Sequence, residues 1–311
     1  YIRETDKDNS YVNNSSLSTT LDLYRYGILK NDDKLRFNIS TYQVVKKNQD
    51  NAVVPTVLPY ITYNYQNYFG KILYKNNLEF YNITRNTNSS THAKEQRKLG
   101  LNSQFDRVIY NLNSKINIKA EIHNQYYQTK DQLISNNKIS SENYRFFPMS
   151  GIFIETPIKH KEKSILITPK VSLIVNSSQK NKNEISNEDS TNQTVNIASQ
   201  SELNRFSGTD KLDNSKRLNY GFTVSNKNIK LNLSQNYEFT DNSNFHIEQG
   251  NDDNLSDLLG SLELNRIINK DNEKFVADYN FRYDFDDDYL KKQNVNINSP
   301  SSIGKFSISY L

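Results

Sequence analysis

Apolar and polar residues alternate along most of this sequence, and the alternation constrains the fold more than any other feature. Residues 116–123 alternate without a break, and residues 229–234 do the same. Between Phe275 and Phe285 every odd-numbered residue is apolar, and every even-numbered residue except Val276 is polar. Successive side chains of a strand point to opposite faces, so these segments predict strands with one apolar and one polar face.

A less regular alternation predicts further strands. Together the segments give about 14 strands, many of about 9–13 residues, which is longer than most strands of soluble proteins and close to the length that crosses a bilayer at a tilt. The further segments are residues 17–26, 34–45, 58–66, 71–84, 99–110, 151–159, 164–176, 217–225, 258–268 and 303–311.

Clusters rich in Asn and Asp separate these segments. Both residue types tolerate left-handed backbone conformations and make local hydrogen bonds, which favours tight turns. Short turns combined with long polar loops are typical of an outer-membrane barrel. The predicted turns are residues 30–33, 75–77, 111–113, 226–228 and 269–272, and the predicted loops are residues 86–98, 129–143, 179–194 and 241–257.

The composition excludes several classes of protein. The chain has 311 residues, no Cys and 12% aromatic residues. Disulfides and thiolate metal sites are therefore excluded, and no apolar run approaches the ~18 residues of a membrane-spanning helix. The aromatic content argues against disorder, and a net charge of +4 without a long basic block gives little support for nucleic-acid binding.

Three features favour a membrane barrel over a soluble sandwich or a β-solenoid surface protein. The strands are long, tyrosines such as Tyr24 and Tyr26 cluster near strand ends as an interfacial girdle requires, and the polar faces suit a hydrated lumen. The predicted fold class is all-β, an antiparallel transmembrane outer-membrane β-barrel, here a partial barrel. A mean hydropathy of -0.82 is compatible with such a barrel, because the average combines apolar residues that face lipid with polar residues of the hydrated lumen and the loops.

No catalytic residue, cofactor or metal site is predicted. Nucleophile-elbow, phosphate-loop and dinucleotide motifs are missing from the sequence, and the histidines have no ligand-like spacing. Two acidic clusters lack the pattern of a helical calcium loop and predict solvated hairpin tips, although such clusters can bind Ca²⁺. Basic clusters predict rim patches or contacts with anionic lipid head groups. The histidines are His92, His123, His160 and His246. The acidic clusters are Asp252, Asp253 and Asp257, and Asp284, Asp286, Asp287 and Asp288. The basic clusters are Lys159, His160, Lys161 and Lys163, and Lys180 and Lys182.

Four prolines, Pro55, Pro59, Pro148 and Pro169, lie in or beside strand patterns. Proline cannot donate a hydrogen bond to a neighbouring strand, so it is unusual there. Two interpretations stay open: these residues mark strand starts and bulges, or they weaken strand pairing where a wall opens or a plug seats.

One stretch of the sequence is more distinctive than the strand patterns and can be compared with known protein families. It runs from Glu202 to Phe222 and resembles the "NRFSG-x-D-[RK] … R-x-x-YG" segment of the LptD family of lipopolysaccharide-assembly outer-membrane proteins. Residues 185–190 look like the "NEDS" element of its alphaproteobacterial members, and residues 54–59, 145–148 and 168–172 resemble further family elements in the same order. The matching residues are Asn187, Glu188, Asp189, Ser190, Asn204, Arg205, Phe206, Ser207, Gly208, Asp210, Arg217, Tyr220 and Gly221.

The resemblance implies a function and a set of partners. Members of the family form a large barrel in the outer membrane of Gram-negative bacteria, and a periplasmic jellyroll domain precedes the barrel in the sequence. An LptE-like lipoprotein plugs the lumen, and an LptA-like periplasmic bridge delivers lipopolysaccharide, which leaves through a lateral opening between the first and last strands. The expected role is thus lipopolysaccharide assembly into the outer leaflet, without covalent chemistry. A general porin or uptake barrel and a surface-displayed β-rich adhesin are the alternatives.

The chain departs from the family pattern in two respects. It has too few predicted strands for the large family barrel, and no jellyroll domain precedes the barrel motifs. We therefore expect one domain, residues 1–311, that is a fragment of an LptD-like barrel and cannot close on its own, because unpaired edges are not tolerated in lipid. Within it, we expect Arg205 and Asp210 to pair and hold an inward-folded loop or strand bend, with direct substrate contact as the alternative.

Overall fold

The computed structural model describes residues 16–30, 32–45, 51–88, 92–160, 164–190, 196–240, 254–267, 274–301 and 304–310. Most of these residues lie in strands, with one short 3-10 helix (Asn51–Val53) and one short α-helix, α2 (Ile197–Gln200). In the described ranges no helix has the length and apolar character needed to cross a membrane.

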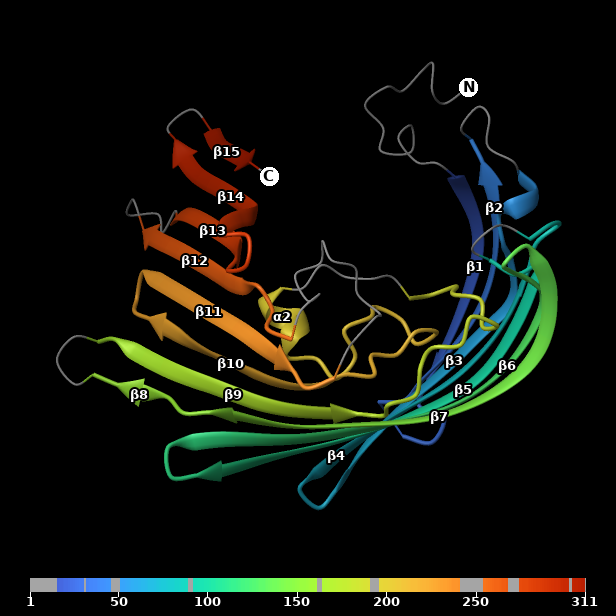
Figure 1. The fold of residues 1–311 in the computed structure, drawn as a ribbon, viewed down its shortest axis with the longest axis horizontal. Coiled ribbons are helices and arrows are strands. Elements are labelled where there is room, and N and C mark those ends of the chain that lie inside the picture. Colours follow the sequence, from blue (N-terminus) through green and yellow to red (C-terminus); the bar gives the residue numbers. More distant parts are fainter. Residues whose placement is uncertain are drawn as a thin grey trace. The chain divides into compact units, whose positions relative to one another are not determined.

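The strands follow one another in a single antiparallel order (Figure 1). Each strand pairs with its neighbours in the sequence, except that β9 pairs with β7 as well as with the two-residue β8. The strands are β1 (Ser16–Tyr26), β2 (Lys34–Val44), β3 (Thr56–Phe69), β4 (Ile72–Thr84), β5 (Glu95–Asn111), β6 (Ser114–Ile134), β7 (Asn137–Glu155), β8 (Ile158–Lys159), β9 (Leu166–Asn176), β10 (Lys216–Ser225), β11 (Ile229–Glu238), β12 (Leu258–Ile267), β13 (Lys274–Asp284), β14 (Tyr289–Ser301) and β15 (Gly304–Tyr310). The predicted all-β antiparallel class is confirmed.

The two faces of the sheet reverse the usual arrangement of a soluble protein. On β9, Val171 and Leu173 are 45% and 43% exposed, whereas Ser172 and Asn176 between and beyond them are buried. The same holds on other strands, where large apolar side chains are exposed and Asn, Gln, Arg and Lys are buried. Apolar residues outward and polar residues inward are the pattern of a membrane barrel. We call the buried polar side the inner face.

Two sequence predictions about turns and loops are wrong, and one strand was missed. Residues 129–143, predicted as a loop, are the ends of β6 and β7, joined by a two-residue turn at Ser135 and Asn136, both with positive φ. Such turns match the twist of a hairpin. The polar composition misled the prediction, because polar cross-strand pairs such as Gln128 with Glu142 occupy this hairpin. Residues 75–77 lie inside β4, whose turn is formed by Gly70 (φ 61), and β14 was not predicted at all.

Two predicted turns are confirmed and two other turn predictions are only partly described or lie outside the described residues. Leu112, with φ 52, connects β5 to β6. The Asn226 side chain accepts hydrogen bonds from the amides of Asn228 and Ile229, each at 2.8 Å, and so closes the β10–β11 turn. Residue 31 of the turn at 30–33 and residues 269–272 lie outside the described ranges.

By its contacts the chain divides into two compact units. Unit 1 comprises residues 1–105, 121–148 and 180–190, and unit 2 comprises residues 106–120, 149–179 and 191–311.

Candidate functional site

The connection between β9 and β10 holds most of the residues that resemble the family motifs. We call its described parts, residues 177–190 and 196–215, the inward segment, because its side chains bind to the inner face of the strands. Residues 180–190 belong to unit 1, and residues 196–215 belong to unit 2.

In unit 1, Glu188 forms a buried ion pair with Arg85. The Arg85 guanidinium donates from Nη1 and Nη2 to the two carboxylate oxygens of Glu188 at 3.0 and 2.5 Å. Both side chains are 4% exposed, and His92 Nδ1 lies 3.8 Å from the same carboxylate. Arg85 also donates to the carbonyl oxygens of Val53 and Ala93. A two-pronged pair of this kind fixes geometry as well as charge.

The next residue of the segment, Asp189, binds a fully buried lysine. Lys98 Nζ lies 3.3 Å from Asp189 and 3.0 Å from Glu79. The ammonium also lies 5.3 Å from the centre of the Tyr81 ring and 5.7 Å from that of Tyr127. A buried ammonium requires such partners, because isolated charge is strongly disfavoured in a dry interior.

Hydrogen bonds complete the docking of this part. The Ser186 amide donates to Gln96 Oε1, and Gln96 Nε2 donates to the Ser186 carbonyl, both at 2.7 Å. Asn187 closes the turn, because its Oδ1 accepts from the Ser190 amide at 3.0 Å and its Nδ2 donates to the Ser190 carbonyl. In the "NEDS" element, therefore, Asn187 and Ser190 shape the turn while Glu188 and Asp189 bind the strands.

In unit 2, two arginines and two carboxylates form a buried cluster. Arg205 donates from Nε and Nη2 to Asp213 at 2.5 and 3.2 Å, and its Nη2 lies 2.7 Å from Glu238. Arg217 Nη1 donates to the same Asp213 at 3.0 Å. All four side chains are at most 3% exposed. Burial lowers the pKa of Arg205, but the nearby Asp213 and Glu238 outweigh it, so the pKa is raised and the guanidinium stays charged.

The remaining motif residues of this loop make short-range contacts. Asn204 Nδ2 donates to the Gly208 carbonyl at 2.9 Å, and its Oδ1 accepts from the amides of Phe206 and Asp213. Phe206 and Asp210 are buried, and Ser207 is exposed. The Asn204 side chain thus ties this loop into a compact corner.

The strand that follows carries the last two motif residues. Tyr220 donates its hydroxyl to Gln235 Oε1 at 2.9 Å. A Cβ atom added to Gly221 would lie 2.2 Å from the Leu233 carbonyl oxygen and 2.9 Å from Ser234 Cα. Because no side chain fits there, Gly221 permits the close approach of β10 and β11.

The partners of these motif residues were not predicted from the sequence. The described ion pairs of Arg205 go to Asp213 and Glu238, and Glu188 and Asp189 bind Arg85 and Lys98. One signal was available. Pairing β10 with β11 about the turn at residues 226–228 places Glu238 opposite Arg217.

The four prolines lie at different places in the strands. Pro55 precedes β3, and Pro59 follows a cis peptide bond inside β3, where the register shifts against both β2 and β4. Pro148 lies within β7, and Pro169 lies within β9 opposite Phe222.

The other candidate residues within the described ranges form no common site. His123 lies beside Asn102 at 2.9 Å, Asp257 pairs with Arg282 at 3.0 Å, and Asp284 accepts from the amides of Asp286 and Asp287 at a hairpin turn. In the part of the chain that the structure describes, no three His, Cys, Asp or Glu side chains are grouped so as to hold a metal ion. His246, Asp252, Asp253, Lys161 and Lys163 lie outside the described residues.

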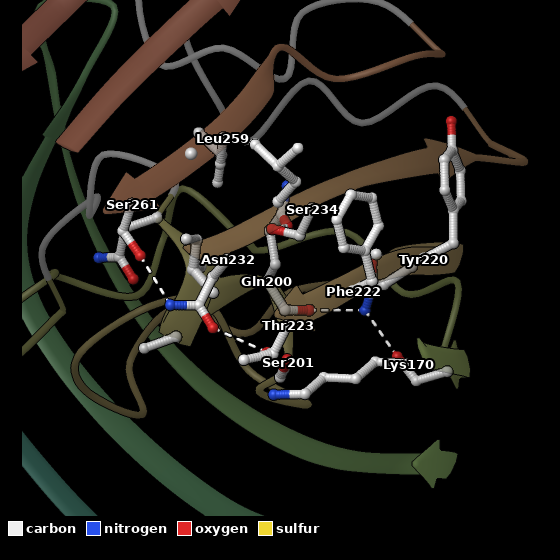
Figure 2. Close-up of a pocket in the computed structure, with 18 of the residues that line it drawn as sticks. Lys170, Gln200, Ser201, Tyr220, Phe222, Thr223, Asn232, Ser234, Leu259 and Ser261 are labelled. Atoms are coloured by element: carbon white, nitrogen blue, oxygen red, sulfur yellow. Dashed lines mark hydrogen bonds between the residues drawn. The ribbon is translucent and has the colours of Figure 1, made fainter. Parts of the chain in front are cut away.

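A pocket of about 850 Å³ opens on the inner face of unit 2. Its wall includes a row of polar side chains in which Thr223 Oγ1 donates to Asn232 Oδ1 at 2.7 Å and Asn232 Nδ2 donates to Ser261 Oγ at 2.8 Å (Figure 2). Gln200 and Ser201 of the inward segment line the pocket as well.

Comparison with known proteins identifies one family. The family model described as LptD, LPS transport system D, matches residues 1–311. Among solved structures, the NanC porin in a rhombohedral crystal form is 9% identical with a TM-score of 0.24, covering 80% of this chain and 91% of that chain. A likeness this weak carries no argument about function. No curated protein matches the chain.

Proposed function

Since the chain belongs to the LptD family, whose members transport and assemble lipopolysaccharide at the outer membrane and are not enzymes, we propose that it acts in the outer-membrane translocon for lipopolysaccharide. In this role it receives lipopolysaccharide from the periplasm and passes it into the outer leaflet. The observation that carries the proposal is the family match over the whole chain.

The reversed faces of the sheet support a place in the membrane. Exposed Leu, Ile, Val and Phe side chains on the outer face offer an apolar surface to lipid, and the inner face offers Asn, Gln, Ser and charged groups to water. A molecule with a long sugar chain and several phosphates needs such a hydrated path, because polar groups are costly to move through hydrocarbon.

The partners of the chain follow from the same proposal. An LptE-like lipoprotein would occupy the lumen, and an LptA-like bridge would deliver lipopolysaccharide through a jellyroll domain joined to this barrel region. Residues 1–311 would be one barrel domain of that larger assembly. The inward segment would then form part of the inner wall that the plug and the substrate meet.

Depletion of the protein in its own bacterium tests the proposal. Lipopolysaccharide at the cell surface, measured by its accessibility to outer-leaflet modifying enzymes, is expected to fall as the protein is depleted and to recover when the gene is restored. Normal surface lipopolysaccharide together with slowed entry of small solutes would contradict the proposal and favour a porin. Loss of cell adhesion alone would favour an adhesin.

A further inference from the structure

The pocket on the inner face of unit 2 carries more basic than acidic side chains. Strands β6, β7 and β9 to β14 contribute to it, together with residues 196–202 of the inward segment. The acidic lining residues are Glu155, Glu202 and Glu263, and the basic ones are Lys115, Lys119, Lys170, Lys230, Lys292 and Arg282.

Half of these basic groups are already neutralised. Lys115 lies 3.9 Å from Glu155, Lys230 lies 3.3 Å from Glu263, and Arg282 lies 3.0 Å from Asp257. The other three, Lys119, Lys170 and Lys292, have no carboxylate within 4.0 Å among the residues that the structure describes. The pocket therefore holds three ammonium groups that are available to an anion.

The strand register places like charges face to face in this pocket. Arg282 of β13 lies directly opposite Lys292 of β14. Like charges in directly opposed positions destabilise a sheet. Asp257, 3.0 Å from Arg282, offsets part of this repulsion, and an anion bound beside Lys292 would offset the rest.

Uncharged acceptors surround the basic groups. The Oδ1 atoms of Asn117, Asn219 and Asn294 are buried and accept no hydrogen bond within the described part of the chain. Asn219 is 6% exposed, and its Nδ2 is held by Ser172 Oγ at 3.0 Å and by the Gln200 carbonyl at 2.7 Å. Its Oδ1 is thus fixed in position as an acceptor for a hydroxyl group.

Ammonium groups for a phosphate and amide oxygens for hydroxyls define one ligand chemistry. We propose that this pocket binds a phosphorylated saccharide, with the phosphate on Lys119, Lys170 and Lys292 and sugar hydroxyls on the asparagine oxygens. The inference rests on the proposed function, because the ligand would be the sugar part of lipopolysaccharide in transit. A free sugar phosphate has the same chemistry, and the experiment separates the two sources.

The test uses the full-length protein in its own outer membrane. The exposed pocket residue Ser201 (Figure 2) is replaced by the photoreactive p-benzoylphenylalanine, and cross-linking to lipopolysaccharide is measured in living cells. A cross-link is expected. Combining it with K119Q, K170Q and K292Q should weaken the cross-link about tenfold, because three charge-assisted contacts are lost.

Two further variants keep the test falsifiable. The matched control replaces three exposed lysines outside the pocket (K71Q, K138Q and K227Q), and it should leave the cross-link unchanged. Lysine-to-arginine changes at the three pocket positions should retain it. Each variant is compared at equal protein level in the outer membrane, with equal mobility shift on heating as evidence of folding.

The outcomes separate this inference from the proposed function. If depletion stops lipopolysaccharide delivery but Ser201 gives no cross-link, or a cross-link that is indifferent to the pocket lysines, the pocket assignment is wrong and the proposed function stands. If purified protein binds glucose 6-phosphate through the same lysines and lipopolysaccharide never cross-links, the lipopolysaccharide source is overturned. If depletion leaves delivery intact, the proposed function itself fails.

Discussion

Arg205 offers the sharpest test of how the inward segment is held. The cluster in unit 2 contains two guanidinium groups, Arg205 and Arg217, and two carboxylates, Asp213 and Glu238, with side chains at most 3% exposed. Its charges balance. Arg205→Ala removes one cation and leaves Asp213 and Glu238 with Arg217 in a dry site.

The expected loss is large because the whole cluster is buried. Removing one partner of a buried ion pair costs about 3–5 kcal/mol. The pair of Arg36 with Asp22 is the matched control, because its two side chains are 35% and 29% exposed. Arg36→Ala should cost about 0–1 kcal/mol, as exposed pairs do. Arg205→Lys should lie between the two, since it keeps the charge and loses the two-pronged geometry.

The measurement is reversible urea unfolding of the protein in detergent, combined with the amount of heat-modifiable protein in the outer membrane. R205A should lower both, and R36A should change neither appreciably. If R205A unfolds like R36A and assembles normally while lipopolysaccharide delivery slows, the structural interpretation of Arg205 is refuted, and direct contact with the substrate takes its place.

Two further predictions concern single positions. Gly221→Ala should reduce assembly, because its Cβ would lie 2.2 Å from the Leu233 carbonyl oxygen, whereas Gly100→Ala meets nothing closer than 3.5 Å and should be tolerated; outer-membrane levels of both variants decide the point. Asp33 caps the β1–β2 turn: burial raises its pKa, but hydrogen bonds from the Leu29 amide, the Tyr63 hydroxyl and two further amides outweigh this, so the pKa lies below the ordinary 3.8. The contribution of Asp33 to the stability of the turn is therefore full above pH ~4 and lost as the pH falls through the lowered value. Acid should thus reduce the protection of the turn amides, measured as exchange relative to the intrinsic rate at each pH, and Asp33→Asn should remove that pH dependence.

The strands could be predicted from the sequence wherever the two faces of a strand differ in polarity. Residues 275–285 alternate with the single exception of Val276, and β13 (Lys274–Asp284) covers all of them but the last. The hairpin of β6 and β7 could not be predicted around Ser135. Polar residues occupy both faces of most of this hairpin, so the two-residue alternation of apolar and polar residues that indicates a strand is missing. β14 was not predicted for a similar reason, because Asn, Lys and Gln interrupt the alternation of its apolar residues.

Only part of the candidate site could be predicted from the sequence. Motif residues such as Glu188 and Arg205 could be singled out, but their partners could not. Arg85 lies 103 residues from Glu188 in sequence, and no local spacing connects them. Glu238 could have been placed, because the β10–β11 hairpin register sets it opposite Arg217. Partners within one hairpin are accessible to sequence reasoning, whereas partners across the sheet require the fold.

The reversed faces explain why the recognisable motifs of this chain are charged and lie in a connection between strands. A loop of a soluble protein docks on an apolar core, so the residues that fix it are apolar. Here most large apolar side chains face outward, so residues 180–190 dock on an inner face that is mainly polar. Ion pairs and directed hydrogen bonds, such as those of Glu188 and Asp189, must then supply the specificity that packing supplies elsewhere. Replacing them with apolar residues of equal size would leave Arg85 without its carboxylate partner and Lys98 with Glu79 alone.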